Sequence, residues 1–337
     1  MTRLLRFTPG TRVVVTGGLG FIGSNLVLAL LRLGARVTVV DPCVPGCGGN
    51  PENLGEDLKR VEWLPLDMDQ VDLLEDTIRS AQIVFNLAGE IRHQQSMLDP
   101  LRDLNLNARS QLLFVHACAR WNPGVRIVYA GSRQVYGVPQ YLPVDEDHPV
   151  VPVDFNGIHK QAAASYHLLL SRLGSLDACI LRLTNVYGSR MAIDVPGQGF
   201  MGAFIRCLRD GIGLTVFGDG TQVRDPLHVD DAVAAFLLAG TIPHLPARVY
   251  NLGGPDVLSL LEIASRAAAL CGAPQPGLRA FPPDHRLIDI GDYWANSARI
   301  QADLGWRAGV RFEDGLRDTL NSYGLLSPLS EARMAIQ

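Results

Sequence analysis

Three glycines in the segment TGGLGFIG, Gly17, Gly20 and Gly23, follow a short apolar run and precede a helical one. Glycine at this spacing allows a tight turn, close approach of a pyrophosphate to the backbone, and close packing of the next helix on the sheet. The helix that opens with Phe21 and Ile22 adds free N–H groups and a favourable dipole for phosphate oxygens. The segment therefore predicts a dinucleotide-binding turn.

Residues at the ends of further predicted strands fit the rest of a dinucleotide. Asp41 ends the second strand, where a carboxylate accepts hydrogen bonds from a ribose 2′-hydroxyl and repels a 2′-phosphate, which favours NAD over NADP. The segment Asp67-Met68 follows the third strand, and its carboxylate can receive an adenine amino group. The segment Leu87-Ala88-Gly89 follows the fourth strand, at the sheet edge where ligands bind.

The scaffold that positions these residues is predicted from alternating periodicities. Strand-like runs at 12–17, 35–41, 81–88, 125–132 and 177–188 alternate with helical patterns at 24–34, 69–81, 103–121 and 161–174. Because parallel strands need crossover helices, the fold class predicted is α/β, a doubly wound parallel Rossmann sheet. We expect 1–187, with about 225–255, to form the NAD-binding domain, and 188–224 and 256–337 a smaller, partly interleaved α/β lobe that binds the substrate.

Composition narrows the functional class. The chain has 337 residues, of which 47% are hydrophobic and 19% charged, so it can bury a sizeable core. The net charge of −4 shows no excess of positive charge, and we expect neither nucleic acid nor a membrane as partner. No targeting segment or membrane span is visible, which predicts a cytoplasmic protein. The pair Cys43 and Cys47 has no matching Cys or His spacing elsewhere, so we expect no metal site.

These motifs together resemble the extended short-chain dehydrogenase/reductase family, the nucleotide-sugar epimerases and dehydratases. The similarity runs from TGGLGFIG through GSRQVYG, LRLTNVYG and RDPLHVDD to NLGG and LGW, and it is closest to UDP-glucose 4-epimerase-like and CDP-tyvelose epimerase-like members. It implies an NAD-dependent epimerase that oxidises a sugar hydroxyl to a keto intermediate and then returns the hydride. It also implies that Ser132 hydrogen-bonds a sugar hydroxyl, and that Lys160 binds the nicotinamide ribose and lowers the pKa of a neighbouring acid.

One position departs from the resemblance. The family carries a catalytic tyrosine four residues before the lysine, where this chain has Asn156. An amide can orient a hydroxyl but cannot exchange a proton near neutral pH. Another group could supply the acid/base function, the chemistry could be altered so that a different carbon is oxidised or the proton leaves by water, or hydride chemistry could be lost. The candidates for a substitute group are Tyr136 on the loop GSRQVYG at 131–137 (the serine loop), His159 beside the lysine, and Glu90 and His93 after the fourth strand.

The resemblance also implies where the nucleotide sugar binds. Asn185 takes the place of an asparagine that meets the substrate diphosphate, and Arg224 and Arg286 take the places of phosphate-binding arginines. Glu90 is placed near the sugar, and Asn105 near the nicotinamide and the sugar.

Alternatives to the epimerase remain open. The dehydratases of the family carry Asp-Glu directly after the serine, where this chain has Arg133-Gln134, which favours epimerisation over dehydration without excluding it. A non-catalytic NAD-bound regulator or scaffold is the third hypothesis. The resemblance also implies a homodimer in which the helices at 105–121 and 161–173 of two subunits pack together. The apolar residues of these helices could equally face the sheet of their own subunit: Leu112, Val115, Leu168 and Leu169.

Overall fold

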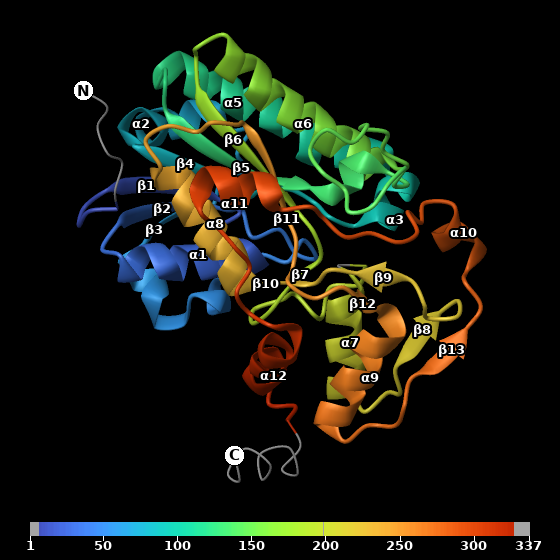
Figure 1. Ribbon diagram of the computed structural model, residues 1–337. Coiled ribbons are helices and arrows are strands. Elements are labelled where there is room, and N and C mark those ends of the chain that lie inside the picture. Colours follow the sequence, from blue (N-terminus) through green and yellow to red (C-terminus); the bar gives the residue numbers. More distant parts are fainter. Residues whose placement is uncertain (1–6, 198, 327–337) are drawn as a thin grey trace.

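A seven-stranded sheet forms the centre of the larger domain in the computed structural model, which describes residues 7–197 and 199–326 (Figure 1). All its strands are parallel, in the order β3-β2-β1-β4-β5-β6-β11. The direction of winding reverses between β1 and β4, and a ligand crevice opens at such a switch point. The strands are β1 (Arg12–Thr16), β2 (Arg36–Val40), β3 (Glu62–Leu64), β4 (Ile83–Asn86), β5 (Arg126–Ser132), β6 (Asp177–Leu183) and β11 (Val249–Leu252).

Helices cover both faces of this sheet, so its central strands are buried on both sides and read as continuous apolar runs. Val13 and Val15 of β1 belong to the core on one face, and Val14 belongs to the core on the other. One face carries α1 (Phe21–Arg32), α8 (Val229–Thr241) and α11 (Ala298–Leu304). The other carries α2 (Glu75–Ser80), α5 (Ser110–Trp121) and α6 (Phe155–Arg172), with α3 (His93–Leu98) and α4 (Pro100–Leu104) beside them. The predicted fold class is confirmed.

A smaller lobe lies to one side, around its own apolar core of Phe204, Val216, Ile263 and Phe312 among others (Figure 1). Its strands form short pairs: β7 (Val186–Tyr187) with β10 (Leu227–His228), β9 (Val223–Arg224) with β12 (Leu258–Ser259), and β8 (Thr215–Phe217) with β13 (Gly277–Arg279). Its helices are α7 (Phe200–Arg209), α9 (Leu260–Cys271), α10 (Pro283–Arg286) and α12 (Phe312–Ser322).

Two segments differ from the sequence expectations. Ile300, Leu304 and Trp306 lie in the core of the large domain, so the stretch around α11 returns to the sheet although we expected all of 256–337 in the lobe. The helix expected at 103–121 begins at Pro100 and passes through a wide, π-type turn at Asn105–Arg109. Such turns change which side chains face inward, and they often lie at functional sites.

Candidate functional site

The glycine turn joins β1 to α1 at the switch point of the sheet. Gly17 has φ of +68°, and a Cβ there would lie 2.9 Å from Ala88, on the loop after β4. A Cβ on Gly23 would lie 2.1 Å from the carbonyl oxygen of Gly17. A Cβ on Gly20 would meet only Gly17 O among the described residues, at 3.2 Å, so this position is open on its outer side. Gly17 and Gly23 therefore build the turn, and Gly20 leaves space in front of it.

The start of α1 can receive an anion. Gly20 is the N-cap residue and provides no side-chain cap. Among the described residues, the N–H groups of Phe21, Ile22 and Gly23 have no acceptor. Unpaired N–H groups at a helix start, facing an open glycine, fit the pyrophosphate of a dinucleotide.

Asp41 lies directly after β2, beside this turn. Its two oxygens accept hydrogen bonds from the backbone N–H groups of Leu19 (3.0 Å) and Cys43 (2.9 Å), which orient the carboxylate. Burial raises the pKa of Asp41, and these two bonds oppose the rise. A carboxylate held in this way retains lone pairs for ribose hydroxyls.

An open pocket of about 450 Å³ lies at the same end of the crevice. It is lined by Val44, Asp67, Asp99, Arg102, Asn105 and Leu106. Asp67 is exposed there, as an adenine ligand should be, whereas Met68 is buried against Gln111. The residues from Gly17 to Asp67 thus fit a bound NAD.

Lys160 lies on α6 against the loop that follows β4. A Cβ on Gly89 would lie 2.5 Å from Lys160 Nζ and 2.6 Å from Asn107 Oδ1, so only glycine lets these groups approach the backbone. Asn107 Oδ1 also accepts from the Glu90 N–H (3.0 Å), and Asn107 Nδ2 is buried with no acceptor among the described residues. Burial lowers the pKa of Lys160 to about 8, although the charges of Asp103 and Glu90 oppose this.

Ser132 ends β5 and is half-buried. Its Oγ accepts a hydrogen bond from the Gln134 N–H (3.1 Å), so it caps the short turn Arg133–Tyr136. A hydroxyl that accepts from the backbone still has its own proton to donate. Ser132 can therefore donate to a sugar oxygen.

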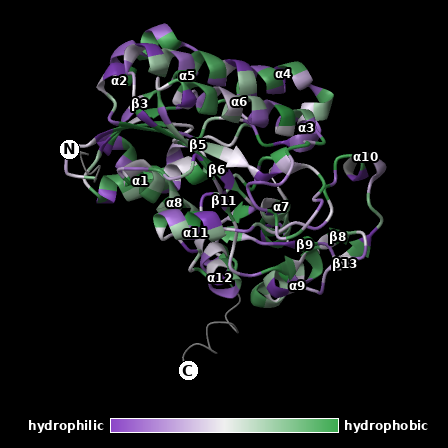
Figure 2. Cartoon of the chain, turned by 45° about the horizontal axis from the view of Figure 1, so that its top comes forward, coloured by the Kyte–Doolittle hydropathy of each residue, from purple (hydrophilic) through white to green (hydrophobic). Residues whose placement is uncertain are grey.

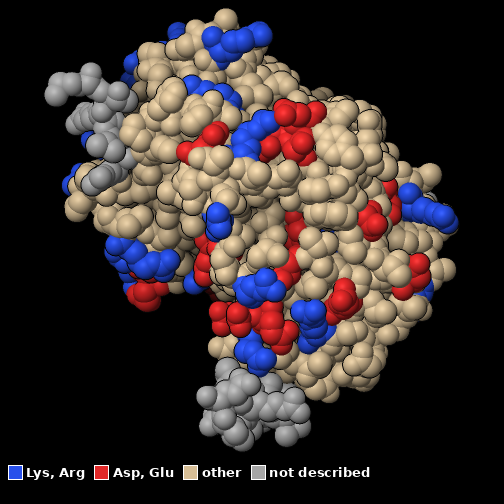
Figure 3. Space-filling model, in the orientation of Figure 1, with Lys and Arg blue, Asp and Glu red and all other residues tan. Residues whose placement is uncertain are grey.

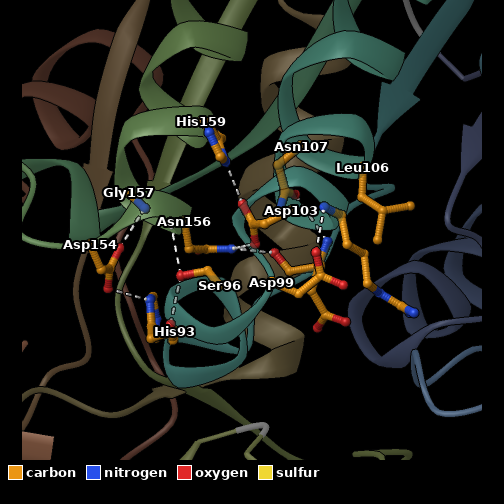
Figure 4. Close-up of polar contacts among 12 residues, drawn as sticks. His93, Ser96, Asp99, Asp103, Leu106, Asn107, Asp154, Asn156, Gly157 and His159 are labelled. Carbon is orange, nitrogen blue, oxygen red and sulfur yellow. Dashed lines mark hydrogen bonds and ion pairs between the residues drawn. The ribbon is translucent and has the colours of Figure 1, made fainter. Parts of the chain in front are cut away.

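Asn156, one helical turn before Lys160, has both amide hydrogens in use (Figure 4). Its Nδ2 donates to Glu90 O and to Asp103 Oδ2, both at 2.9 Å, and its backbone N–H donates to Ser96 Oγ at 3.2 Å. The residue is 1% exposed. These donors join α6 to the segment 90–103, whereas Oδ1 can still accept from a hydroxyl, so the orienting role of Asn156 stays a prediction.

Tyr136 also differs from its predicted role. The side chain is fully buried, and its hydroxyl donates to Asn251 Oδ1 and accepts from Arg182, both at 2.7 Å. Burial raises its pKa, and the charge of Arg182 only partly offsets the rise. A hydroxyl held inside the domain in this way cannot exchange protons with a substrate. The interpretation of Tyr136 as the substitute acid/base is therefore wrong.

The remaining candidates are separated by their surroundings. His159 is buried, and its Nδ1 lies 2.7 Å from Asp103 Oδ1 (Figure 4). Glu90, predicted to bind substrate, has its oxygens occupied by its own loop, including the Arg92 guanidinium at 2.6 and 2.9 Å. His93 differs, because its side chain is 36% exposed while Nδ1 lies 2.9 Å from Oδ2 of the buried Asp154.

Asp154 connects this histidine to the rest of the site. It caps α6 by accepting from the Gly157 N–H (2.6 Å), and its other oxygen accepts from Gln134 on the serine loop (2.9 Å). Burial acts to raise its pKa, but the bonds from His93, Gly157 and Gln134 outweigh it, and the pKa of Asp154 is lowered. A carboxylate kept ionised beside a half-exposed imidazole can orient that ring.

The predicted substrate residues are only partly brought together. Asn185 lies between β6 and β7 with its Oδ1 buried and without a donor among the described residues. Arg224 is buried, with Nη1 donating to the carbonyls of Val223 and Gly291, both at 2.7 Å. Burial and the nearby Arg133 lower the pKa of Arg224 to about 9. Arg286 is exposed on α10, apart from these contacts.

Two residues of the site were missed by sequence reasoning. Asn107, not Asn105, is the asparagine that contacts Gly89 and Lys160, while Asn105 lines the adenine-side pocket. Asp103 joins Asn156 to His159 (Figure 4). The signal was present, since Asp103, Asn107 and Gln111 are spaced four residues apart and share one face of a helix.

Other kinds of site are not indicated. No helix within 7–197 and 199–326 combines the length and the apolar character that crossing a bilayer requires. Over the same residues, His, Cys, Asp and Glu side chains do not gather in groups of three or more that could hold a metal ion. On the face in Figure 3, cationic and anionic side chains are interspersed.

Comparison with known proteins agrees with this geometry. Residues 13–253 match the model of the NAD dependent epimerase/dehydratase family. A UDP-glucose 4-epimerase from Mycolicibacterium smegmatis is 32% identical over 317 residues, which are 93% of this chain and 98% of that protein.

Solved structures agree as well. The UDP-glucose 4-epimerase of Thermotoga maritima with UDP-glucose superposes with a TM-score of 0.84 at 25% identity, covering 97% of this chain and 100% of that one. A double mutant of a dTDP-glucose 4,6-dehydratase from Streptomyces venezuelae, solved with NAD bound, gives a TM-score of 0.82 at 26% identity, covering 93% of this chain and 97% of that one.

Proposed function

Because the chain belongs to the NAD-dependent epimerase/dehydratase family, we propose that it epimerises a nucleotide-linked sugar with NAD regenerated in each turnover. Bound NAD would accept a hydride from a sugar carbon and return it. The observation that carries the proposal is Lys160, buried against Gly89 and Asn107 at the crevice, with Ser132 at the end of β5. A bare nucleotide sensor has no need of a buried lysine there.

Epimerisation is favoured over dehydration by the residues after Ser132. Elimination of water needs a base for one proton and an acid for the departing hydroxyl. Arg133 is a permanent cation, and the side chain of Gln134 is occupied by Asp154 at 2.9 Å. Neither residue can exchange a proton, so the serine loop supports hydride transfer without elimination.

His93, paired with Asp154, supplies the proton transfer in this proposal. Hydroxyl oxidation releases a proton, and Asn156 and Tyr136 cannot accept it, because the amide does not titrate and the phenol is held in the core. His93 is half-exposed and oriented by an ionised carboxylate that is itself bonded to the serine loop. Its free nitrogen can take the proton directly or through one water.

Product analysis on a panel of UDP-, GDP-, CDP- and dTDP-sugars, by mass and NMR, tests the activity. Loss of the imidazole in His93→Gln should lower kcat about 10²–10⁴-fold with NAD binding retained. His159→Gln is the matched control, since that ring is buried against Asp103. Equal kcat in both variants would contradict the role of His93, and NAD binding without conversion of any sugar would favour the regulator.

We further propose a homodimer through α5 and α6, whose ribbons carry interspersed hydrophobic residues in Figure 2. Leu112 and Leu169 are each 44% exposed, whereas Val115 and Leu168 pack toward their own sheet. Burying exposed leucines favours association by about 25 cal/mol per Å². Light scattering at micromolar concentration should give a dimer, and a double change of Leu112→Lys and Leu169→Lys should give a folded monomer. A monomeric wild-type protein would refute this proposal.

A further inference from the structure

Arg133 begins the turn after Ser132, and its guanidinium group has no direct ion-pair partner among the described residues. Its Cζ is 4.9 Å from the centre of the Tyr293 ring, and its Nη1 is buried with no acceptor in the same part of the chain. Burial lowers the pKa of Arg133, although an arginine still stays charged at neutral pH. A buried cation with an unused donor is costly unless an anion completes it.

The neighbouring carboxylates do not supply an acceptor for the free donor of Arg133. Asp225 accepts hydrogen bonds from the Thr184 hydroxyl and from the Ala295 N–H, and Asp289 accepts from Gln222 at 2.7 Å. Both carboxylates attract Arg133 electrostatically, but neither forms an ion pair with it in the described structure. The other nearby cation, Arg224, repels it; Nη1 of Arg224 donates to the carbonyls of Val223 and Gly291, and its Nη2 donates to Gln222 Oε1 and lies 3.9 Å from Asp289. Arg133 Nη1 therefore remains a buried donor without an acceptor among the described residues.

The position of Arg133 relates this donor to the sugar. It directly follows Ser132, the residue placed for a sugar hydroxyl, whereas the diphosphate candidates Asn185 and Arg224 come from other strands. A guanidinium fork matches the two oxygens of a carboxylate. We propose that Arg133 binds a carboxylate on the sugar, so that the substrate is a nucleotide-linked sugar acid of the uronic class. This inference rests on the proposed function, whose substrate class it names.

Binding measurements on the NAD-loaded protein test the inference. The probes are UDP-glucuronic acid, UDP-glucose and free UDP, or the dTDP series if dTDP binds more tightly than UDP. Wild type should bind the acid at least tenfold more tightly than the neutral sugar. Arg133→Met should weaken binding of the acid by about 10- to 100-fold, the range of a lost charged hydrogen bond, and change the other two ligands less than about threefold. Arg279→Met, at an exposed arginine of β13, is the control and should leave binding of all three ligands unchanged.

The outcomes separate the possible roles of Arg133. An equal loss for the acid, the neutral sugar and free UDP would assign it to the diphosphate and overturn the inference, and unchanged binding of the acid would leave it a structural cation. If Arg133→Met does not fold, as judged by its thermal unfolding, Arg133→Lys keeps the charge and should retain the preference for the acid. Conversion of the neutral sugar without preference for the acid contradicts only this inference. Arg133-dependent binding of the acid without conversion contradicts only the proposed function.

Discussion

The nucleotide end of the crevice is built from backbone, whereas the catalytic end is built from side chains held by distant segments. At the first, Gly17, Gly23 and the start of α1 form a cradle whose shape depends on the absence of Cβ atoms. At the second, Asn156 is held by Asp103, 53 residues away, and Tyr136 is held by Asn251, 115 residues away.

This difference shows which changes each end tolerates. A backbone cradle fails when any bulky residue enters it, so its sequence pattern is narrow. In a site built from side chains, one residue can have a different role while the others keep their positions. Asn156 lies one turn before Lys160 and joins α6 to Asp103, and the proposed mechanism assigns proton transfer to the half-exposed imidazole of His93.

The largest effect is expected at the two residues that the proposed function places against the reacting groups. Ser132→Ala and Lys160→Met should each lower kcat about 10²–10⁴-fold, because one removes the donor to the sugar and the other the buried cation. Ser132→Ala should leave NAD affinity unchanged, whereas Lys160→Met should weaken it through the lost ribose contact. Steady-state kinetics and calorimetry separate these effects. Near wild-type kcat in both variants would place the chemistry elsewhere.

A pH profile sharpens the role of Lys160. Its pKa is lowered to about 8, so the ammonium charge is present below that pH and is lost as the pH rises through it. Activity should therefore fall on an alkaline limb near pH 8. Lys160→Arg, which stays charged, should move this limb upward even if kcat is lower. An identical limb in both proteins would show that another group titrates.

The glycine turn gives the next effect and tests the contrast between backbone and side chains. A side chain at Gly23 would overlap the Gly17 carbonyl, so Gly23→Ala should destabilise the fold by about 1–3 kcal/mol or more. A Cβ at Gly20 would meet only Gly17 O, at 3.2 Å, so Gly20→Val should fold and yet lose NAD binding. Denaturant unfolding and NAD titration measure the two effects. Normal NAD affinity in folded Gly20→Val would show that the glycine motif forms a turn but does not bind the pyrophosphate.

The same contrast explains how much the sequence alone could predict. The sheet, its winding and the glycine turn follow from local periodicity and from glycine positions, and the structure agrees with them. The environment of Tyr136 could not be predicted, because Arg182 and Asn251 reach it only after β5, β6 and β11 assemble. Asn105 was assigned from the resemblance, whereas the structure places Asn107, in the π-type turn Asn105–Arg109, beside Gly89 and Lys160.

The smallest kinetic effect is expected at Asn156. Asn156→Ala leaves Asp103 and the Glu90 carbonyl without their donor, so it should cost about 1–3 kcal/mol of unfolding free energy. Its kcat should fall only a few-fold, because the amide does not touch the reacting groups in the proposed mechanism.

The isosteric Asn156→Asp sharpens this expectation, because it places a second carboxylate beside Asp103. Burial and that neighbour should raise the pKa of the new carboxyl, so the variant should lose stability as the pH rises above about 4 and regain it in acid. Denaturant unfolding between pH 3 and pH 8, with kcat measured in parallel, decides the question. If Asn156→Ala instead keeps wild-type stability but is as inactive as Lys160→Met, the asparagine belongs to the chemistry, and the proton transfer assigned to His93 must be withdrawn.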